Sequence, residues 1–261
     1  MDLLNKDELR KKIDEAEVVL IGIGEEWTIP LEEMLSCPDM FSDIRKLSRI
    51  TDQEAFISNF RKLYYEAFHS EELQRAYHNL FHMCKDKDYF LISLNYDRYP
   101  GLSGFDETKC VYPCGNLDYL QCTDNCSNEL LPAASFYNDF LKILDNPSEG
   151  SAFHMGICPH CGKNVVYNTI EANRYCEGGY LEQWDAYMKF LQKTVNKKLC
   201  MVELGVSMRF PGIIRNAFEK TAFYNQKSSL VRIHQDLIQI PQNIENRCYV
   251  KKENSVSFMG F

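Results

Sequence analysis

Four cysteines in two closely spaced pairs are the clearest candidates for chemistry. Three residues separate Cys122 from Cys126, and the second pair stands in Cys158-Pro-His-Cys161-Gly. Tetrahedral zinc requires such pairs, because each short turn brings two sulfurs to within about 2.3 Å of one ion. Buried free thiols are the alternative, and the 31 residues between the pairs exceed the usual zinc ribbon. We predict a structural zinc site, since four thiolates leave no open position for catalysis.

A second candidate is the pair of glycines in Gly22-Ile-Gly24, directly after an apolar run. Glycines at such a turn let the backbone approach a pyrophosphate at the N-terminus of a helix. Glycine at a strand-to-helix turn is also ordinary turn chemistry, and the third glycine of the usual fingerprint is missing. Glu25 and Glu26 would place negative charge beside a phosphate. The fragment alone therefore does not establish a nucleotide site.

The third candidate is Asn95-Tyr-Asp97, which follows the apolar run FLISL. Ligands of α/β proteins bind at the carboxyl ends of parallel strands, and polar side chains there are suited to contact them. The same pair of residue types is common in plain turns. The functional interpretation thus depends on the sheet to which this run belongs.

Apolar runs of strand length alternate with helical patterns along much of the chain. Buried strands are expected over 17–22, 88–95, 198–205 and 229–235, the last of the series, with a weaker candidate over 110–115. Helical patterns cover 3–16, 179–195 and 210–223, and an aromatic-rich helical stretch covers 31–84. Such alternation predicts an α/β fold: a Rossmann-like parallel sheet with helices on both faces.

Changes in composition divide the chain into three expected regions. The region over 116–168 is rich in Cys, Asn, Asp, Ser and Pro around one helical pattern at 130–144. The expected regions are a Rossmann-like domain over 1–30, 86–117 and 169–261, a helical module over 31–85, and a zinc-binding module over 118–168. The polar and then aromatic tail from Lys251 is expected to be a loose or docking end.

Composition narrows the class of protein. The 29 basic and 37 acidic residues give a net charge of −8, which argues against nonspecific nucleic-acid binding, because that requires a basic face. No apolar run approaches the roughly 18 residues of a membrane span. The charged N-terminus lacks the pattern of a signal peptide, and eleven cysteines then fit a reducing cytosol. We expect a cytoplasmic protein that binds neither membranes nor nucleic acid.

Taken in chain order, these pieces resemble the sirtuins, which are NAD-dependent protein deacylases and ADP-ribosyltransferases. Gly22-Ile-Gly24 is similar to the glycine-rich turn of the family, and Ser93-Leu-Asn95-Tyr-Asp97 is similar to its T-Q-N-I-D. The cysteine pairs match its zinc module, and Gly205-Val-Ser207 resembles its G-T-S. The resemblance covers about residues 17–235, and GYLEQW with the following segments resembles the bacterial branch linked to macrodomains and ADP-ribosylation.

The resemblance implies that NAD and a protein substrate meet in a cleft between a Rossmann-like domain and a small zinc module. It implies that Asn95 and Asp97 lie by the nicotinamide ribose, as catalytic and cofactor-binding residues. The further cofactor-binding residues that it implies are Gly22, Gly24, Gly205, Ser207 and His234.

One position departs from the family in a way that bears on the reaction. The catalytic histidine of the family falls on Cys114, eight residues before Cys122. Imidazole is mostly the free base at pH 7, whereas a thiol titrates near 8.5 and is a poor general base. Loss of that base would slow deacylation by about 10²–10⁴-fold. ADP-ribosyl transfer to a strong external nucleophile depends on it less.

We therefore expect an NAD-consuming transferase that releases nicotinamide and passes ADP-ribose to a protein acceptor, with Cys114 facing the same site as Asn95 and Asp97. An inert buried thiol is an equally weighted interpretation of Cys114. Two alternatives for the function stay open. One is an NAD-dependent protein-lysine deacylase with another base, and the other is a non-catalytic sensor that binds NAD or ADP-ribose.

Overall fold

The structure is a computed structural model that describes residues 4–29, 34, 53–67, 70–145 and 156–260. Its contacts divide the chain into two compact units. The first unit comprises Met1–Thr28, Ser70–Pro113 and Tyr180–Phe261, and the second comprises Ile29–His69 and Cys114–Gly179. Each unit has its own sheet, and the two are described in turn.

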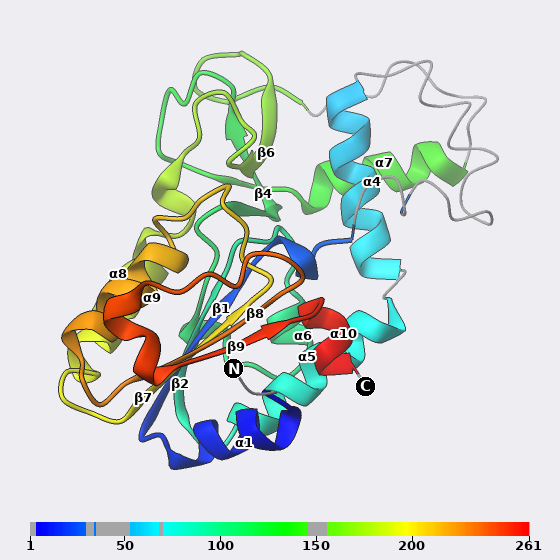
Figure 1. Cartoon of the computed structure of the whole chain (residues 1–261). Coiled ribbons are helices and arrows are strands. Elements are labelled where there is room, and N and C mark those ends of the chain that lie inside the picture. The colour runs from blue at the N-terminus through cyan, green and yellow to red at the C-terminus, as the bar shows by residue number, and fades with distance from the viewer. Residues whose placement is uncertain (1–3, 30–33, 35–52, 68–69, 146–155, 261) are drawn as a thin grey trace. The chain divides into compact units, whose positions relative to one another are not determined.

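The first unit is built on a six-stranded parallel sheet with the strand order β3-β2-β1-β7-β8-β9 (Figure 1). The strands are β1 (Val18–Ile23), β2 (Asp88–Ser93), β3 (Cys110–Val111), β7 (Leu199–Leu204), β8 (Ser229–His234) and β9 (Cys248–Lys252). Every residue of β1 and β7 is buried, as expected for central strands that are covered on both faces.

Helices cover both faces of this sheet. Figure 1 shows α8 (Leu181–Lys193) and α9 (Arg215–Tyr224) on one side, and α1, α5 and α10 on the other. The latter helices span Lys6–Glu15, Glu71–Cys84 and Ser255–Gly260, and the short helix α6 spans Tyr99–Leu102. Single turns of 3-10 helix lie at η1 (Glu25–Trp27) and η2 (Glu107–Lys109), and a longer one at η5 (Gln242–Arg247).

The second unit contains a three-stranded antiparallel sheet with the order β5-β4-β6. Its elements are β4 (Gly115–Cys122), β5 (Leu131–Pro132), β6 (Val165–Thr169), the helices α4 (Gln53–Ala67) and α7 (Ala134–Asp145), and the 3-10 turn η4 (Glu177–Gly179). Hydrogen bonds join α4 to this sheet: the Tyr167 hydroxyl donates to Asn59 Oδ1 at 2.8 Å, and Lys62 Nζ lies 3.0 Å from Asp118 Oδ1.

The predicted α/β fold with a parallel sheet and helices on both faces is confirmed. Of the two expectations for the tail, the docking end is confirmed, whereas the expectation that the strand over 229–235 is the last is wrong. After the strand that was expected to be the last, β9 adds a sixth strand and α10 follows it, with Phe258 and Met259 buried. Lysines at the end of β9 mask its strand character in the sequence, since an edge strand needs few apolar residues. Within the expected helical stretch over 31–84, residues 31–33, 35–52 and 68–69 lie outside the described residues.

No helix in the described part of the chain is both long enough and apolar enough to cross a membrane.

Candidate active site and metal centre

The candidate active site in the first unit lies at the carboxyl edge of the parallel sheet. The strands β1, β2, β7 and β8 run parallel and end at Ile23, Ser93, Leu204 and His234, so the segments that follow them share one edge. The residues predicted to bind the cofactor in this unit follow these ends, apart from Gly22 and His234, which lie inside β1 and β8. Strand order alone brings them together.

Asn95 is held in one orientation and leaves a donor free. It is 2% exposed, its Oδ1 accepts a hydrogen bond from Thr28 Oγ1 at 2.7 Å, and its backbone N–H donates to Ser93 Oγ at 3.2 Å. Its Nδ2 is buried and finds no partner among the described residues. A buried donor without a partner is costly to a folded protein, so this amide is suited to bind a ligand.

Asp97 leaves an acceptor free in the same way. The side chain is 2% exposed, and its Oδ1 accepts the backbone N–H of Tyr99 at 3.0 Å. Its Oδ2 is buried and is left without a hydrogen bond in the part of the chain that the structure describes. Burial raises the pKa of Asp97 from 3.8 to about 7, and the backbone hydrogen bonds oppose this only in part. The carboxyl group therefore changes protonation near neutral pH.

Tyr77 is a third polar group of this site, and the sequence analysis did not single it out. The side chain is fully buried, its ring lies 4.6 Å from Trp27 and 6.0 Å from Tyr99, and its hydroxyl has no hydrogen-bond partner within the described ranges. Burial, and then the charge of Asp97, raise the pKa of Tyr77 well above its usual value, and the side chain of Asn95 opposes this only in part. The hydroxyl is therefore a donor. Tyr77 lies in the buried apolar stripe of α5, which resembles plain core in the sequence.

The predicted cofactor-binding glycines are positions where the chain approaches itself closely. A Cβ on Gly24 would lie 2.3 Å from Val206 Cα, and a Cβ on Gly22 would lie 2.5 Å from a methyl carbon of Ile214. Gly205 has a φ of +62°, which favours glycine. Packing within the protein thus accounts for Gly22 and Gly24, and backbone conformation accounts for Gly205, so their part in binding NAD stays a prediction.

The two glutamates after the glycine turn hold the neighbouring turns together. Glu25 Oε2 accepts the backbone N–H of Ser207 at 3.0 Å, while its Oε1 is buried without a partner among the described atoms. Glu26 accepts the backbone N–H of Gln235 at 2.8 Å, and both the N–H and the hydroxyl of Ser255 at 2.8 and 2.6 Å. The negative charges noted in the sequence therefore serve as hydrogen-bond acceptors that join β1 to the turns after β7 and β8 and to α10.

His234 also has a defined hydrogen-bonding state. Its Nδ1 accepts the backbone N–H groups of Asp236 and Leu237 at 2.9 and 3.0 Å, which leaves Nε2 as the donor of the ring. Ser207 Oγ accepts the backbone N–H of Arg209 at 3.0 Å. Both residues shape the turns in which they lie, and their contact with NAD stays a prediction.

A buried ion-pair network anchors the turns that follow β7 and β8. Arg232 is fully buried and donates from Nε and Nη2 to the two carboxylate oxygens of Glu203, at 2.8 and 2.9 Å, and from Nη2 to Glu219 at 2.8 Å. Arg215 donates to the carbonyl oxygens of Val206 and Leu237 at 3.1 and 2.8 Å. The turn after β7 and the turn after β8 are therefore fastened to one buried group of charges.

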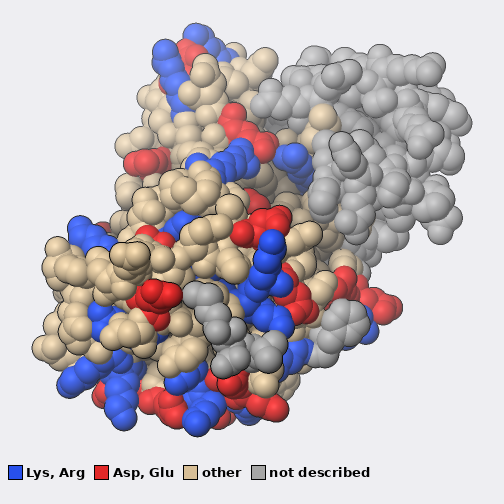
Figure 2. All heavy atoms as spheres, viewed as in Figure 1, with Lys and Arg blue, Asp and Glu red and all other residues tan. Residues whose placement is uncertain are grey.

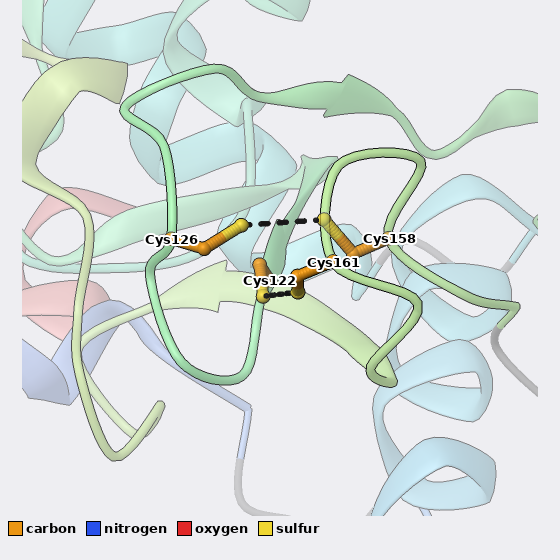
Figure 3. A group of neighbouring side chains, drawn as sticks. All are labelled: Cys122, Cys126, Cys158 and Cys161. Carbon is orange, nitrogen blue, oxygen red and sulfur yellow. Dashed lines mark hydrogen bonds between the residues drawn. The ribbon is translucent and has the colours of Figure 1, made fainter.

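The metal centre lies in the second unit, where the four predicted cysteines converge (Figure 3). All four sulfurs lie within 4.8 Å of one another, with Cys122 Sγ 3.4 Å from Cys161 Sγ and Cys126 Sγ 3.5 Å from Cys158 Sγ. Ligands at about 2.3 Å from a tetrahedral zinc ion lie about 3.8 Å apart, so the cluster fits zinc. Backbone N–H groups of Cys126 and Asp124 lower the pKa of Cys122 to about 6, which favours the thiolate that zinc binds.

Cys114 directly precedes β4 in the second unit, whereas Asn95 and Asp97 belong to the first. It is 1% exposed, forms no disulfide, and its carbonyl oxygen accepts the backbone N–H of Ile170 at 2.9 Å. Gly115 follows with a φ of +84°, and a Cβ there would lie 2.0 Å from the carbonyl oxygen of Asn168. The thiol is thus held on a rigid turn, and its part in a reaction stays a prediction.

Comparisons with known proteins give two relatives in sequence, and no family model matches the chain. A Staphylococcus aureus protein named "Protein ADP-ribosyltransferase" is 23% identical over 92% of this chain and 81% of its own length. A Fusarium oxysporum protein named "Probable bifunctional ADP-ribose hydrolase/ADP-ribosyltransferase" is 26% identical over 49% of this chain, but the match covers only 22% of that protein.

Solved structures resemble the chain over nearly its whole length. Sir2Tm bound to a propionylated peptide gives a TM-score of 0.54 at 16% identity, with 98% of this chain and 96% of that chain covered. A complex of Sir2 with a p53 peptide and NAD+ gives 0.54 at 14% identity, with the same coverage of each chain. At such identities the likeness establishes a shared fold.

Proposed function

The chain has the sirtuin fold, and from this premise we propose that it is an NAD-consuming transferase, which releases nicotinamide and transfers ADP-ribose to a protein acceptor. The observation that carries the proposal is the pair of free polar atoms at the carboxyl end of β2, Asn95 Nδ2 and Asp97 Oδ2. The relative named protein ADP-ribosyltransferase, matched over 92% of this chain, supports the choice of reaction.

The described residues fit NAD because they offer a donor and an acceptor where water is excluded. When NAD is bound, it supplies a nicotinamide–ribose bond that can be broken and an ADP-ribosyl group that can be transferred. Thr28 fixes the amide of Asn95, so the two N–H groups of Nδ2 have fixed directions in which to donate. Asp97 accepts through Oδ2. Because both side chains are already held in position, the free energy of binding can be used to orient NAD.

On the phosphate side, the turn after β7 would hold NAD through its backbone. The N–H of Ser207 is taken up by Glu25, so a phosphate that used this N–H would displace a carboxylate. The remaining cofactor-binding residues in the proposal are Gly22, Gly24, Gly205 and His234. The buried network of Glu203 and Arg232 keeps these turns in place.

Cys114 favours transfer over deacylation, because a thiol is a poor general base near neutral pH. Under the proposal, the acceptor protein supplies its own strong nucleophile. NAD-dependent deacylation of protein lysine is the second candidate function, and the likeness to Sir2Tm bound to a propionylated peptide supports it. Zinc in the second unit would have a structural role, since four thiolates leave no open coordination position for a substrate.

We also propose a cytoplasmic protein that does not bind nucleic acid. Ten described cysteines form no disulfide, and zinc thiolates are stable in a reducing compartment. The net charge of −8 is unfavourable to nonspecific binding of nucleic acid.

Incubation with NAD, followed by mass spectrometry of the products, tests the proposed function. One set of reactions contains proteins of a bacterial lysate, and the other contains acyl-lysine peptides. We expect ADP-ribose on a lysate protein together with free nicotinamide. O-acyl-ADP-ribose from the peptide reactions would establish deacylation instead, and bound NAD without nicotinamide release in either set would establish a sensor.

A further inference from the structure

Two pockets lie next to each other on the first unit, at the amino ends of β7 and β8. The larger has a volume of about 550 Å³ and is lined by Lys12, Lys198 and Lys227, among others. The smaller has about 270 Å³ and is lined by Val195, Lys220, Tyr224 and their neighbours. Consecutive parts of the same two turns line both pockets. Asn95 and Asp97 follow the carboxyl end of β2, so these pockets lie at the opposite edge of the sheet.

The wall that the two pockets share is fixed by hydrogen bonds. Asn225 Nδ2 donates to the carbonyl oxygens of Thr194 and Lys197, each at 3.1 Å, and Asn225 Oδ1 accepts the backbone N–H of Lys227 at 3.1 Å. One side chain therefore fastens the turn between α8 and β7 to the turn between α9 and β8. These hydrogen bonds hold the wall of the two pockets in place.

The larger pocket carries positive charge that nearby carboxylates neutralise only in part: three lysines and one glutamate line it, and Glu17 Oε2 accepts the backbone N–H of Lys198 at 2.8 Å. No carboxylate of the described residues lies within 4.0 Å of the ammonium groups of Lys198 or Lys227, which are both exposed. Glu15 in the lining pairs with Lys12 at 3.7 Å, and Lys12 also lies over the Tyr249 ring. Figure 2 shows basic side chains at the lower edge of the molecule, with acidic side chains among them. In a chain with a net charge of −8, this is a local excess of cations.

The smaller pocket is bordered by large apolar side chains that face solvent. Val195 is 66% exposed and Tyr224 is 72% exposed, and the Phe223 ring lies 5.1 Å from the Tyr224 ring. Exposed aromatic side chains grouped beside a pocket are typical of surfaces that bind another protein. A free anion such as phosphate would make no use of them.

We propose that this surface, the amino-edge surface of Lys198, Lys220, Lys227, Val195 and Tyr224, binds an acidic segment of a partner protein. Carboxylates of the segment pair with Lys198 and Lys227, and one apolar side chain of the segment occupies the smaller pocket beside Tyr224. The lysines supply a charge opposite to that of the partner, which speeds the encounter and selects acidic partners. The apolar pocket then adds a contact that a uniformly charged chain cannot make.

Fluorescence anisotropy with a defined probe tests this proposal. The probe is a fluorescein-labelled peptide of Asp and Glu residues around a single Leu, and the matched probe carries Ser in place of Leu. We expect the full-length protein to bind the Leu probe, to bind the Ser probe about fivefold more weakly, and to lose about tenfold in affinity between about 50 and 200 mM salt.

Two double variants with the same change in net charge provide the control. Lys198→Glu with Lys227→Glu should weaken binding of the Leu probe at least tenfold. Lys251→Glu with Lys252→Glu, at the carboxyl end of β9, should leave it within about twofold, because distant surface charges are screened. Tyr224→Ser should reduce the preference for Leu over Ser without changing the salt dependence. The side chains of Lys198, Lys227 and Tyr224 are exposed, so the variants at the amino-edge surface should fold, which circular dichroism checks.

Several outcomes would overturn the proposal. Failure of the wild-type protein to bind the Leu probe, or an equal loss in both double variants, would remove the basis for a local site. Equal affinity for the Leu and Ser probes, with complete displacement of either by inorganic phosphate, would indicate a general anion site. Self-association of the protein alone that the Lys198→Glu, Lys227→Glu variant abolishes would identify a second copy of the chain as the occupant.

Discussion

Replacement of Asp97 by Asn should change how the stability of the protein depends on pH. The substitution keeps the shape of the side chain, and Oδ1 can still accept the N–H of Tyr99. It removes the carboxyl group of Asp97, whose ionisation burial disfavours. Because the pKa of Asp97 rises from 3.8 to about 7 on folding, the native state binds more protons than the unfolded state between about pH 4 and pH 7. Stability from this group is therefore present at low pH and is lost as the pH rises through 7.

The magnitude follows from the two pKa values. The difference between 3.8 and about 7 corresponds to about 4 kcal/mol of unfolding free energy over the full range of pH. Between about pH 5 and pH 8, the wild-type protein should lose about 2.5 kcal/mol relative to the Asp97→Asn variant. Other titrating groups contribute equally to both proteins, so the difference between them isolates Asp97.

Urea unfolding followed by tryptophan fluorescence measures this difference. Both tryptophans, Trp27 and Trp184, belong to the first unit, which also contains Asp97, so the signal reports on the relevant unit. We expect the stability of the variant relative to wild type to increase steadily from about pH 5 to pH 8. Parallel curves for the two proteins over this range would refute the reasoning, because Asp97 would then titrate alike in the folded and unfolded states.

Three further predictions concern the other groups. Cys158→Ser should reduce bound zinc from one ion per chain to nearly none and expose the second unit to protease, and a full complement of metal in the variant would contradict the four-cysteine site. Tyr77→Phe keeps the ring contacts and removes the free hydroxyl, so NAD affinity measured by calorimetry should fall by about fivefold to tenfold without loss of stability. Glu203→Gln leaves Arg232 and Arg215 with too little negative charge and should cost about 3–5 kcal/mol in urea unfolding, whereas Lys251→Gln should cost less than about 1 kcal/mol.

The parallel sheet could be predicted because its central strands are buried on both faces and are continuously apolar in the sequence. The strands β1, β2, β7 and β8 lie close to the predicted ranges for this reason. The strand β4 was not predicted, since it contains the buried polar residues Asn116 and Gln121. Gln121 Oε1 accepts hydrogen bonds from Asn168 Nδ2 and from the backbone N–H of Cys176, partners that are distant in the sequence. Pairing of this kind leaves no local pattern.

The zinc centre could be predicted in full because short spacing within each cysteine pair is itself the geometric requirement. The unsatisfied hydrogen-bonding atoms of Asn95 and Asp97 could not be predicted. They depend on which oxygen of each side chain is bound by Thr28 or by the N–H of Tyr99. Tyr77 reaches this site only because α5 packs beside η1 and α6, which the spacing of residues along α5 does not reveal. Local sequence spacing likewise does not reveal that Ser255, in α10, donates a hydrogen bond to Glu26.

The most direct test of the account is nicotinamide release from NAD by the wild-type protein and by Asn95→Ala, in the presence of lysate proteins. Asn243→Ala makes the same chemical change at an exposed position in η5 and serves as the control. We expect release by wild type and by the control, and none by Asn95→Ala, because the buried amide that orients the ligand is gone. Equal release by all three proteins would contradict the assignment of this edge of the sheet as the active site.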